Sequence, residues 1–139
     1  MTLTIATATR ALMLDGFEDS MEVGSGTANF TVYQTNTALA VFPLNATPFG
    51  AAVNDSAAAA SAPINSTGTE VAGKANRFVI TNQNGDTVMS GTISAVGGGG
   101  DLEVPALTVT AAATQTLNAL VLRMAADGAV TLEGSLTLV

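Results

Sequence analysis

The sequence of 139 residues contains no cysteine, no histidine and no tryptophan. Without cysteine the chain has no disulfide framework, no thiolate metal site and no cysteine nucleophile. The absence of histidine also removes the other common ligand of transition metals, and the side chain most used for acid–base chemistry near neutral pH. An enzyme is not excluded by these absences, but its simplest catalytic arrangements are.

Charge is also scarce. Charged residues make up 11% of the chain, against about 25% in typical soluble domains, and the net charge is −7. The four basic residues are Arg10, Lys74, Arg77 and Arg123. So few cations cannot form the basic patch that neutralises phosphate groups, so we expect neither nucleic acid nor an anionic membrane as a partner.

Long apolar runs are missing as well. No uninterrupted stretch approaches the roughly 18 residues that a transmembrane helix needs. The first residues, MTLTIATATRALML, lack the basic start of a secretory signal. We therefore expect a soluble protein that is made in the cytoplasm.

The shortage of charge also describes the expected surface. A charged surface of roughly 25–35% Lys, Arg, Glu and Asp keeps a monomer in solution, whereas this chain offers Thr, Ser, Asn, Ala and Gly. Two interpretations stay open: the surface is buried against partners, or the composition reflects a genome whose codons favour these residues.

A chain of this length is expected to form one domain, residues 1–139, with a substantial core. Helical spacing occurs near the N-terminus, where Leu14, Phe17 and Met21 recur on one face. This pattern predicts a short amphipathic helix from Ala6 to Asp19, within an N-terminal helix-and-loop unit over residues 1–26. The helix either caps one end of a sheet structure or serves as a docking arm.

A central hairpin is predicted over residues 74–94. Its turn contains Asn84-Gly85, the dipeptide that a two-residue type I′ turn prefers. That turn sets Ile80 opposite Met89 and Phe78 opposite Gly91. One face is then apolar and the other mostly polar, which is typical of an antiparallel sheet packed on a core from one side.

A second hairpin is predicted at the C-terminal end, where residues 125–139 add a strand. A three-residue loop with Gly128 in the left-handed region sets Met124 opposite Val130. The even-numbered apolar residues from 120 to 138 then share one face. The other face carries Leu117 and permits a diagonal Arg123–Glu133 pair. No polar tail follows, so we expect an open, apolar edge strand that invites contact with another chain.

Four further extended segments are predicted, at residues 28–34, 38–44, 57–62 and 102–110. Pro43 places the end of the second at a sheet edge or a bulge, and Pro105 interrupts the last. Short strands with a turn signal every 8 to 12 residues predict a mainly β fold. We expect an antiparallel β-sandwich, jelly-roll or immunoglobulin-like, with one short N-terminal helix.

No motif names a reaction. The glycine run Gly97–Gly100 is followed by Asp101 and Glu103, which put carboxylates where a phosphate would sit, so we interpret it as a flexible connection between strands. The acidic residues near the helix do not match a calcium-loop pattern and are expected to form a solvated face; they are Asp15, Glu18, Asp19 and Glu22. No catalytic, metal-binding or cofactor-binding residue is predicted.

The segments ALAVFPLNATPFGAA and ANRFVITNQNGDTVMSGTIS, the latter followed by a glycine stretch and DLEV, carry a resemblance. The chain resembles small Ala/Gly/Thr-rich virion structural proteins of tailed bacteriophages, from Ala6 to about Met124. Those proteins commonly stop near the equivalent of Met124, so residues 125–139 are an addition. The resemblance implies no catalytic residues.

These observations together predict a non-enzymatic virion protein without cofactors. It is expected to be a capsid decoration or cement protein on the capsid exterior. Its expected partners are the major capsid protein and further copies of itself, with a trimer as one candidate. The alternatives are a tail, baseplate or head-fibre component and, from another class, a carbohydrate-binding or adhesin module. The predicted contact residues are apolar and near the chain ends: Leu12, Met13, Phe17, Met21, Leu132, Leu136 and Leu138.

Overall fold

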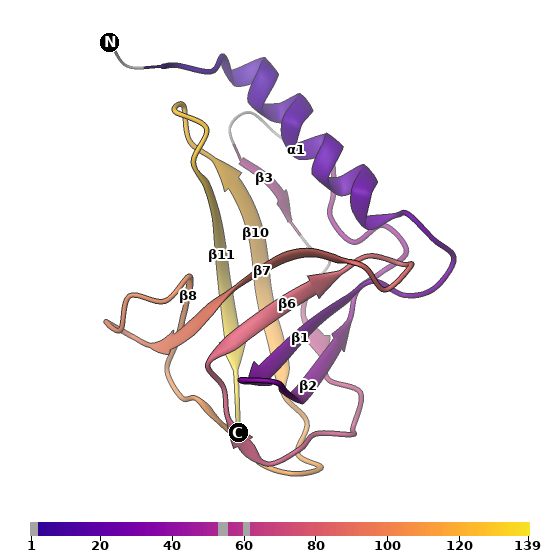
Figure 1. The fold of residues 1–139 in the computed structure, drawn as a ribbon, viewed down its shortest axis with the longest axis vertical. Helices are drawn as coiled ribbons and strands as arrows, with labels where there is room; N and C mark the ends of the chain where they lie inside the picture. The colour runs from indigo at the N-terminus through magenta and orange to yellow at the C-terminus, as the bar shows by residue number, and fades with distance from the viewer. Residues whose placement is uncertain (1–2, 53–55, 60–61) are drawn as a thin grey trace.

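The computed structural model describes residues 3–52, 56–59 and 62–139, and within them the chain is mainly β with one N-terminal helix (Figure 1). The elements in chain order are α1 (Thr7–Met21), β1 (Asn29–Gln34), β2 (Thr37–Pro43), β3 (Ser56–Ala59), β4 (Ile64–Asn65), β5 (Gly73–Lys74), β6 (Arg77–Thr81), β7 (Thr87–Ala95), β8 (Leu102–Val104), β9 (Thr108–Val109), β10 (Thr116–Met124) and β11 (Val130–Thr137). The predicted fold class is thus confirmed at the level of secondary structure.

The strands form open sheets. The larger has the order β2-β1-β6-β7-β8, a second has the order β11-β10-β3 with β4 also paired to β10, and β5 pairs with β9. Among the described strands, β7 and β8 pair in parallel and the other pairs are antiparallel. The expectation of a purely antiparallel fold is therefore wrong at this one pair.

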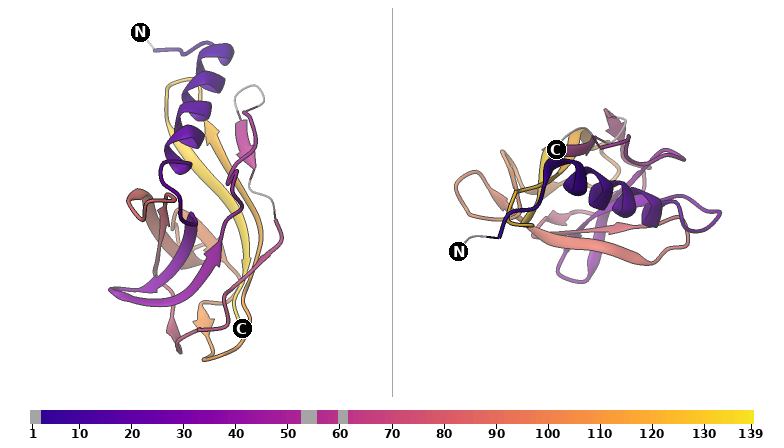
Figure 2. Two further views of the ribbon diagram at one scale, coloured as in Figure 1. Left: turned by 90° about the vertical axis from the view of Figure 1, so that its right-hand side faces the viewer. Right: turned by 90° about the horizontal axis from the view of Figure 1, so that it is seen from above.

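One hydrophobic core cluster is shared by the two larger sheets. Phe30 stacks on Phe78, with ring centroids 5.4 Å apart, and meets Phe42 edge to face at 5.9 Å. Leu120 and Leu122 of β10 belong to the same buried cluster. Figure 2 shows the purple and pink strands of the larger sheet and the yellow C-terminal hairpin in different layers. The core thus ties the first half of the chain to its last strands.

Helix α1 lies over one end of the molecule, next to β3 and β10 (Figure 1). It covers Thr7–Met21, so it begins one residue later and ends two residues later than predicted. Leu14 and Met21 are buried, as the helical spacing indicated. Phe17 packs edge to face on Phe49, with ring centroids 5.7 Å apart. The inner face of the helix is therefore part of this chain's core.

The central hairpin has the predicted register but a different turn. Ile80 pairs with Met89, as expected. Gly85 has a φ of 88°, whereas Asn84 is not among the residues with positive φ, so the turn is not of type I′. Gly85 N donates to Asn82 O at 3.0 Å, which makes a longer loop, and a register shift between Ile80 and Thr81 restores the predicted pairing.

The C-terminal hairpin matches its prediction closely. Met124 pairs with Val130, Gly128 has a φ of 91°, and Arg123 Nε lies 2.9 Å from Glu133 Oε2. Leu117 was expected on the outer face, but it is fully buried. The cause is a register shift between residues 117 and 119, which reverses the alternation and turns Leu117 inward.

The remaining strands are close to the predicted segments. β1 and β2 form a hairpin, and β2, which ends at Pro43, is an edge strand of the larger sheet. β3 confirms a strand at the predicted segment 57–62 but begins one residue earlier, at Ser56, and residues 60–61 lie outside the described part of the chain. Residues 102–110 hold β8 and β9, separated around Pro105 as expected.

Candidate interaction surface

Four of the seven predicted contact residues belong to the core. Met21 is 0% exposed, Leu132 9%, Leu136 3% and Leu138 4%. The even-numbered face of the β10–β11 hairpin packs against the larger sheet of this chain and leaves those side chains no surface to offer a partner. The prediction that these four residues contact a partner is therefore wrong, because other parts of the same chain cover them.

The other three residues lie on α1. Phe17 is half-buried against Phe49, whereas Leu12 is 71% exposed and Met13 47% exposed. Leu12 faces away from the buried Leu14, about 200° around the helix, and Met13 lies on the flank between them. We call this pair of exposed residues the outer helix face. It is the part of the predicted contact surface that stays accessible.

Hydrogen bonds to distant segments fix the position of α1. Arg10 Nη1 donates to Met124 O at 3.2 Å, and Ile5 N donates to Ala126 O at 2.6 Å. Near the other end of the helix, Ala52 N donates to Asp15 Oδ1 at 2.8 Å. The sequence predicted that Asp15 belongs to a solvated face. The structure shows instead that Asp15 is bound to the backbone of a distant segment. The outer helix face is held at a defined place on the molecule.

The neighbouring acids affect each other. Burial raises the pKa of Glu18 above its usual value, and the negative charges of Glu22, Asp15 and Asp19 raise that pKa further. The acidic side of α1 is thus a region of mutual repulsion around Glu18, which a basic partner surface would relieve.

The C-terminal edge strand is tied down at its end. Gln115 is fully buried, and its side chain forms a pair of hydrogen bonds with Val139: Val139 N donates to Oε1 at 2.6 Å and Nε2 donates to Val139 O at 3.0 Å. Thr110 N also donates to Val139 O, at 2.8 Å. β11 is an edge strand of its sheet, as predicted, but its last residues are held inside this chain.

A buried carboxylate lies next to this anchor. Glu70 is 5% exposed, and its Oε1 accepts hydrogen bonds from Ser66 Oγ and, at 2.9 Å, from Gly68 N. The Ser66 hydroxyl is the main reason why the pKa of Glu70 is lowered, and burial opposes that effect. Because Gln115 N donates to Ser66 Oγ at 2.8 Å, the two polar groups form one network. Neither Gln115 nor Glu70 carried a signal in the sequence, because each sits alone in a loop without a motif.

The glycine loop after β7 is organised by a carboxylate from β8. Glu103 accepts hydrogen bonds from Gly97 N at 3.1 Å and from Gly99 N at 3.0 Å, and these bonds lower its pKa. Gly100 N donates to Ser94 Oγ at 2.9 Å. The sequence pattern suggested a flexible connection with carboxylates in the place of a phosphate. The structure shows one of those carboxylates bound to the loop amides.

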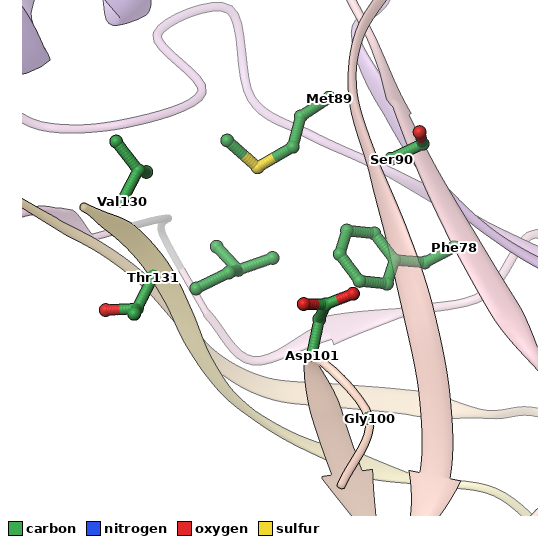
Figure 3. A pocket seen from close by; sticks show the side chains of 8 residues that line it. Phe78, Met89, Ser90, Gly100, Asp101, Val130 and Thr131 are labelled. Atoms are coloured by element: carbon green, nitrogen blue, oxygen red, sulfur yellow. The ribbon is translucent and has the colours of Figure 1, made fainter.

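A cleft of about 460 Å³ opens between β7 and β11 (Figure 3). Half of its lining residues are apolar (Phe78, Met89, Val130 and Leu132), and the others are polar or small, with Asp101 as the charged group. We call it the seam cleft. It lies between the larger sheet and β11.

Comparisons with known proteins identify no relative of this chain. No protein-family model matches the sequence, and searches of curated proteins and of solved structures found no significant match. Within the described residues, no three or more His, Cys, Asp or Glu side chains are grouped so as to hold a metal ion. The helix of the described part of the chain is too short and too polar to cross a membrane.

Proposed function

We propose that this chain is a non-enzymatic structural protein of a tailed-phage virion, a decoration or cement protein on the outer surface of the capsid. The observation that carries the proposal is the outer helix face. Leu12 and Met13 are large, apolar and exposed on a helix whose position is fixed. An exposed apolar pair on a surface with little charge is suited to contact with another protein.

The segment that carries the family resemblance supports a structural role. It forms β6, β7, the glycine loop and β8, and its polar side chains hold the turns of that unit. Asn82 Oδ1 accepts from Asn84 N at 3.0 Å, Asp101 Oδ2 from Thr92 N at 2.8 Å, and Glu103 from the glycine loop. These polar side chains bind backbone groups of their own turns and loops, which supports a structural role for this segment.

The proposed mechanism is mechanical. The protein bridges neighbouring capsid subunits and so opposes expansion of the shell. Full burial of a Leu or Met side chain is worth roughly 1.5–3 kcal/mol, so the outer helix face contributes roughly 2–4 kcal/mol per copy, given that Met13 is already half-covered. Many copies on one shell add these small contributions, because each contact restrains the same lattice.

For the architecture, we infer an open β-sandwich. Its support is that the buried residues of both larger sheets belong to one core cluster. The parallel β7–β8 pair argues against an immunoglobulin-like or jelly-roll order of strands. A sandwich of this kind presents α1 at one end, next to β3 and β10 (Figure 1).

The proposal is tested by adding purified protein to empty capsids of a phage that encodes this chain. The test variant is Leu12→Ser with Met13→Ser. The matched control is Val71→Ser with Val96→Ser, because those valines are also exposed, at 46% and 71%, but lie on loops far from α1 in the sequence. Binding is measured by co-sedimentation, and stabilisation by the temperature at which the capsids rupture.

We expect the wild-type chain and the control variant to bind and to raise the rupture temperature, and the helix variant to bind at least tenfold more weakly. Failure of the wild-type chain to bind contradicts the proposal, as does equal binding by all three proteins. Binding to tails alone supports a tail, baseplate or fibre component. Glycan binding that disappears on substitution of Tyr33 supports the adhesin alternative.

A further inference from the structure

Asn84 and Gly85 form the only Asn-Gly pair in the sequence, and both are exposed at the tip of the β6–β7 hairpin. In such a pair the backbone nitrogen of the glycine can attack the side-chain amide carbon of the asparagine. Glycine favours this attack because it has no Cβ to crowd its nitrogen and because it adopts a wide range of φ. Gly85 has a φ of 88°. The dipeptide thus has both the chemistry and the access to water that deamidation requires.

The turn holds the reacting groups close together. Asn84 Nδ2 donates to Asp86 Oδ2 at 3.0 Å, so the side chain of Asn84 points forward along the chain, past Gly85. Gly85 N donates to Asn82 O at 3.0 Å, and this bond must open before the nitrogen can attack. An exposed turn opens at a far smaller cost than global unfolding. Local opening of the turn is therefore the step that admits the reaction.

Asn82 keeps the turn closed. This residue is 5% exposed, and its Oδ1 accepts hydrogen bonds from Asn84 N at 3.0 Å and from Asp86 N at 2.9 Å. Its backbone oxygen holds Gly85 N as well. One buried residue thus ties down the three residues that follow the loop's first corner.

We propose that Asn84 is a site of spontaneous deamidation and that Asn82 sets its rate by holding the turn closed. Gly85 N bonds to Asn84 Cγ, the Cγ–Nδ2 bond breaks, and the amide nitrogen leaves as ammonia with the proton that Gly85 N gives up. Water then opens the cyclic succinimide at either carbonyl group and yields aspartate or isoaspartate. In total one water is consumed and one ammonia is released, without any oxidant or reductant.

The modified turn lies where the hairpin meets the end of α1 (Figure 1). Gln83 N donates to Met21 O at 3.2 Å, and Gly26 N donates to Gln83 O at 3.0 Å. A Cβ on Gly24 would lie 2.6 Å from the Gln83 carbonyl carbon, so the two backbones touch. Isoaspartate adds a methylene group to the main chain beside this contact. Either product also places a second carboxylate near Asp86, in place of the amide that donated to it. Deamidation is therefore expected to loosen the hairpin from α1.

The test uses the isolated full-length protein, because the reaction needs no partner. The protein is stored at neutral and at mildly alkaline pH, and samples are digested with trypsin over several weeks. Cleavage after Arg77 and Arg123 releases residues 78–123 as one peptide. Tandem mass spectrometry then locates the mass gain that replacement of an amide by an acid produces. Asn118, which precedes an alanine on the same peptide, is the internal control, and a sample digested at time zero corrects for deamidation during digestion.

Three variants separate the parts of the proposal. Asn84→Gln cannot form the five-membered ring and is the unreactive control. Asn82→Ala removes the side chain that holds the turn. Gly91→Ala strains the same hairpin away from the turn, because its Cβ would lie 2.7 Å from the Phe78 ring, and so reports on reaction through unfolding. Urea unfolding before and after storage measures the effect of the modification on stability.

We expect Asn84 to be converted while Asn118 stays intact, with isoaspartate among the products. The rate should rise with pH, because the attacking nitrogen must lose its proton. Asn82→Ala should react about tenfold faster than wild type, since the turn loses two hydrogen bonds, whereas Gly91→Ala should react at the wild-type rate. Storage should lower the urea midpoint of the wild type and leave that of Asn84→Gln unchanged.

Each part of the proposal can fail separately. An intact Asn84 after storage, or equal conversion of Asn84 and Asn118, overturns the modification site. No acceleration in Asn82→Ala, or an equal acceleration in Gly91→Ala, overturns the role of Asn82, because the reaction would then follow unfolding of the chain. An unchanged urea midpoint in fully converted protein overturns the expected loosening at the end of α1.

Discussion

Replacing Gln115 with Met is expected to destabilise the protein strongly for a single polar substitution. The fully buried Gln115 side chain makes hydrogen bonds to Val139 N, Val139 O and Ala113 O. Met has a similar volume and no amide, so the change removes these bonds without leaving a large cavity. Each net hydrogen bond is worth about 0.5–1.5 kcal/mol, so we expect a loss of about 3 kcal/mol in the free energy of unfolding.

Urea unfolding, followed by circular dichroism, measures this loss. With a slope of about 2 kcal/mol/M, the midpoint should fall by about 1.5 M at an unchanged slope. From the typical entropy of unfolding per residue, the melting temperature of this 139-residue chain should fall by about 10 °C.

The control is the same substitution at Gln83. That side chain is half-buried and makes one hydrogen bond, from Nε2 to Ala46 O at 2.9 Å, so its loss should cost about 1 kcal/mol or less. If the two variants lie within about 0.5 kcal/mol of each other, the idea that Gln115 anchors the end of the chain is refuted.

Three further predictions concern charge and space. The pKa of Glu70 is lowered from 4.5 because the Ser66 hydroxyl donates a hydrogen bond to its carboxylate. The ionised Glu70 side chain therefore stabilises the fold above pH 4.5, and this stabilisation is lost as the pH falls through the folded-state pKa. The difference in unfolding free energy between wild type and Glu70→Gln, measured by urea unfolding, should narrow below pH 4.5. Gly91→Ala should lower the melting temperature and cost about 1–3 kcal/mol in the free energy of unfolding, because the new Cβ would lie 2.7 Å from the Phe78 ring. Gly16→Ala should stabilise α1 by up to ~1 kcal/mol, because a Cβ at that position meets nothing within 4 Å. A double-mutant cycle on the exposed Arg123–Glu133 pair should give a coupling below about 1 kcal/mol that shrinks with added salt; a larger, salt-independent value contradicts this.

Both long hairpins were predictable because turn chemistry and alternation agree in them. Asn84-Gly85 and Asp127-Gly128 each place a glycine where φ is positive, and the apolar residues then fall on one side. For the central hairpin the predicted turn type was wrong, yet the register held, because a longer loop and a bulge offset each other. Alternation along the strands therefore gave a firmer guide than the turn dipeptide.

Other features had no local signal. The parallel β7–β8 pair is joined by a short glycine loop, whereas parallel strands usually need a crossover of a dozen or more residues. The bulge at Asn118, which turns Leu117 inward, leaves no mark in a simple alternation. Such details depend on contacts between distant segments.

The candidate contact surface shows a further limit of sequence patterns. Alternation shows which side chains share a face, but not what covers that face. Leu132, Leu136 and Leu138 were correctly placed on one apolar side of their hairpin, and that side is covered by this chain rather than by a partner. Leu12 and Met13, on the outer side of a helix whose inner side is already filled, remain exposed.

The docking of α1 has a consequence for how the protein is made. The helix precedes every strand in the sequence, yet Arg10 and Ile5 bond to Met124 and Ala126, in the final hairpin. A helix made before these strands must therefore wait for the β10–β11 hairpin to emerge from the ribosome before it can dock. Until β10 and β11 have been made and can pack, nascent chains expose Leu14 and Met21 to chaperones and to one another.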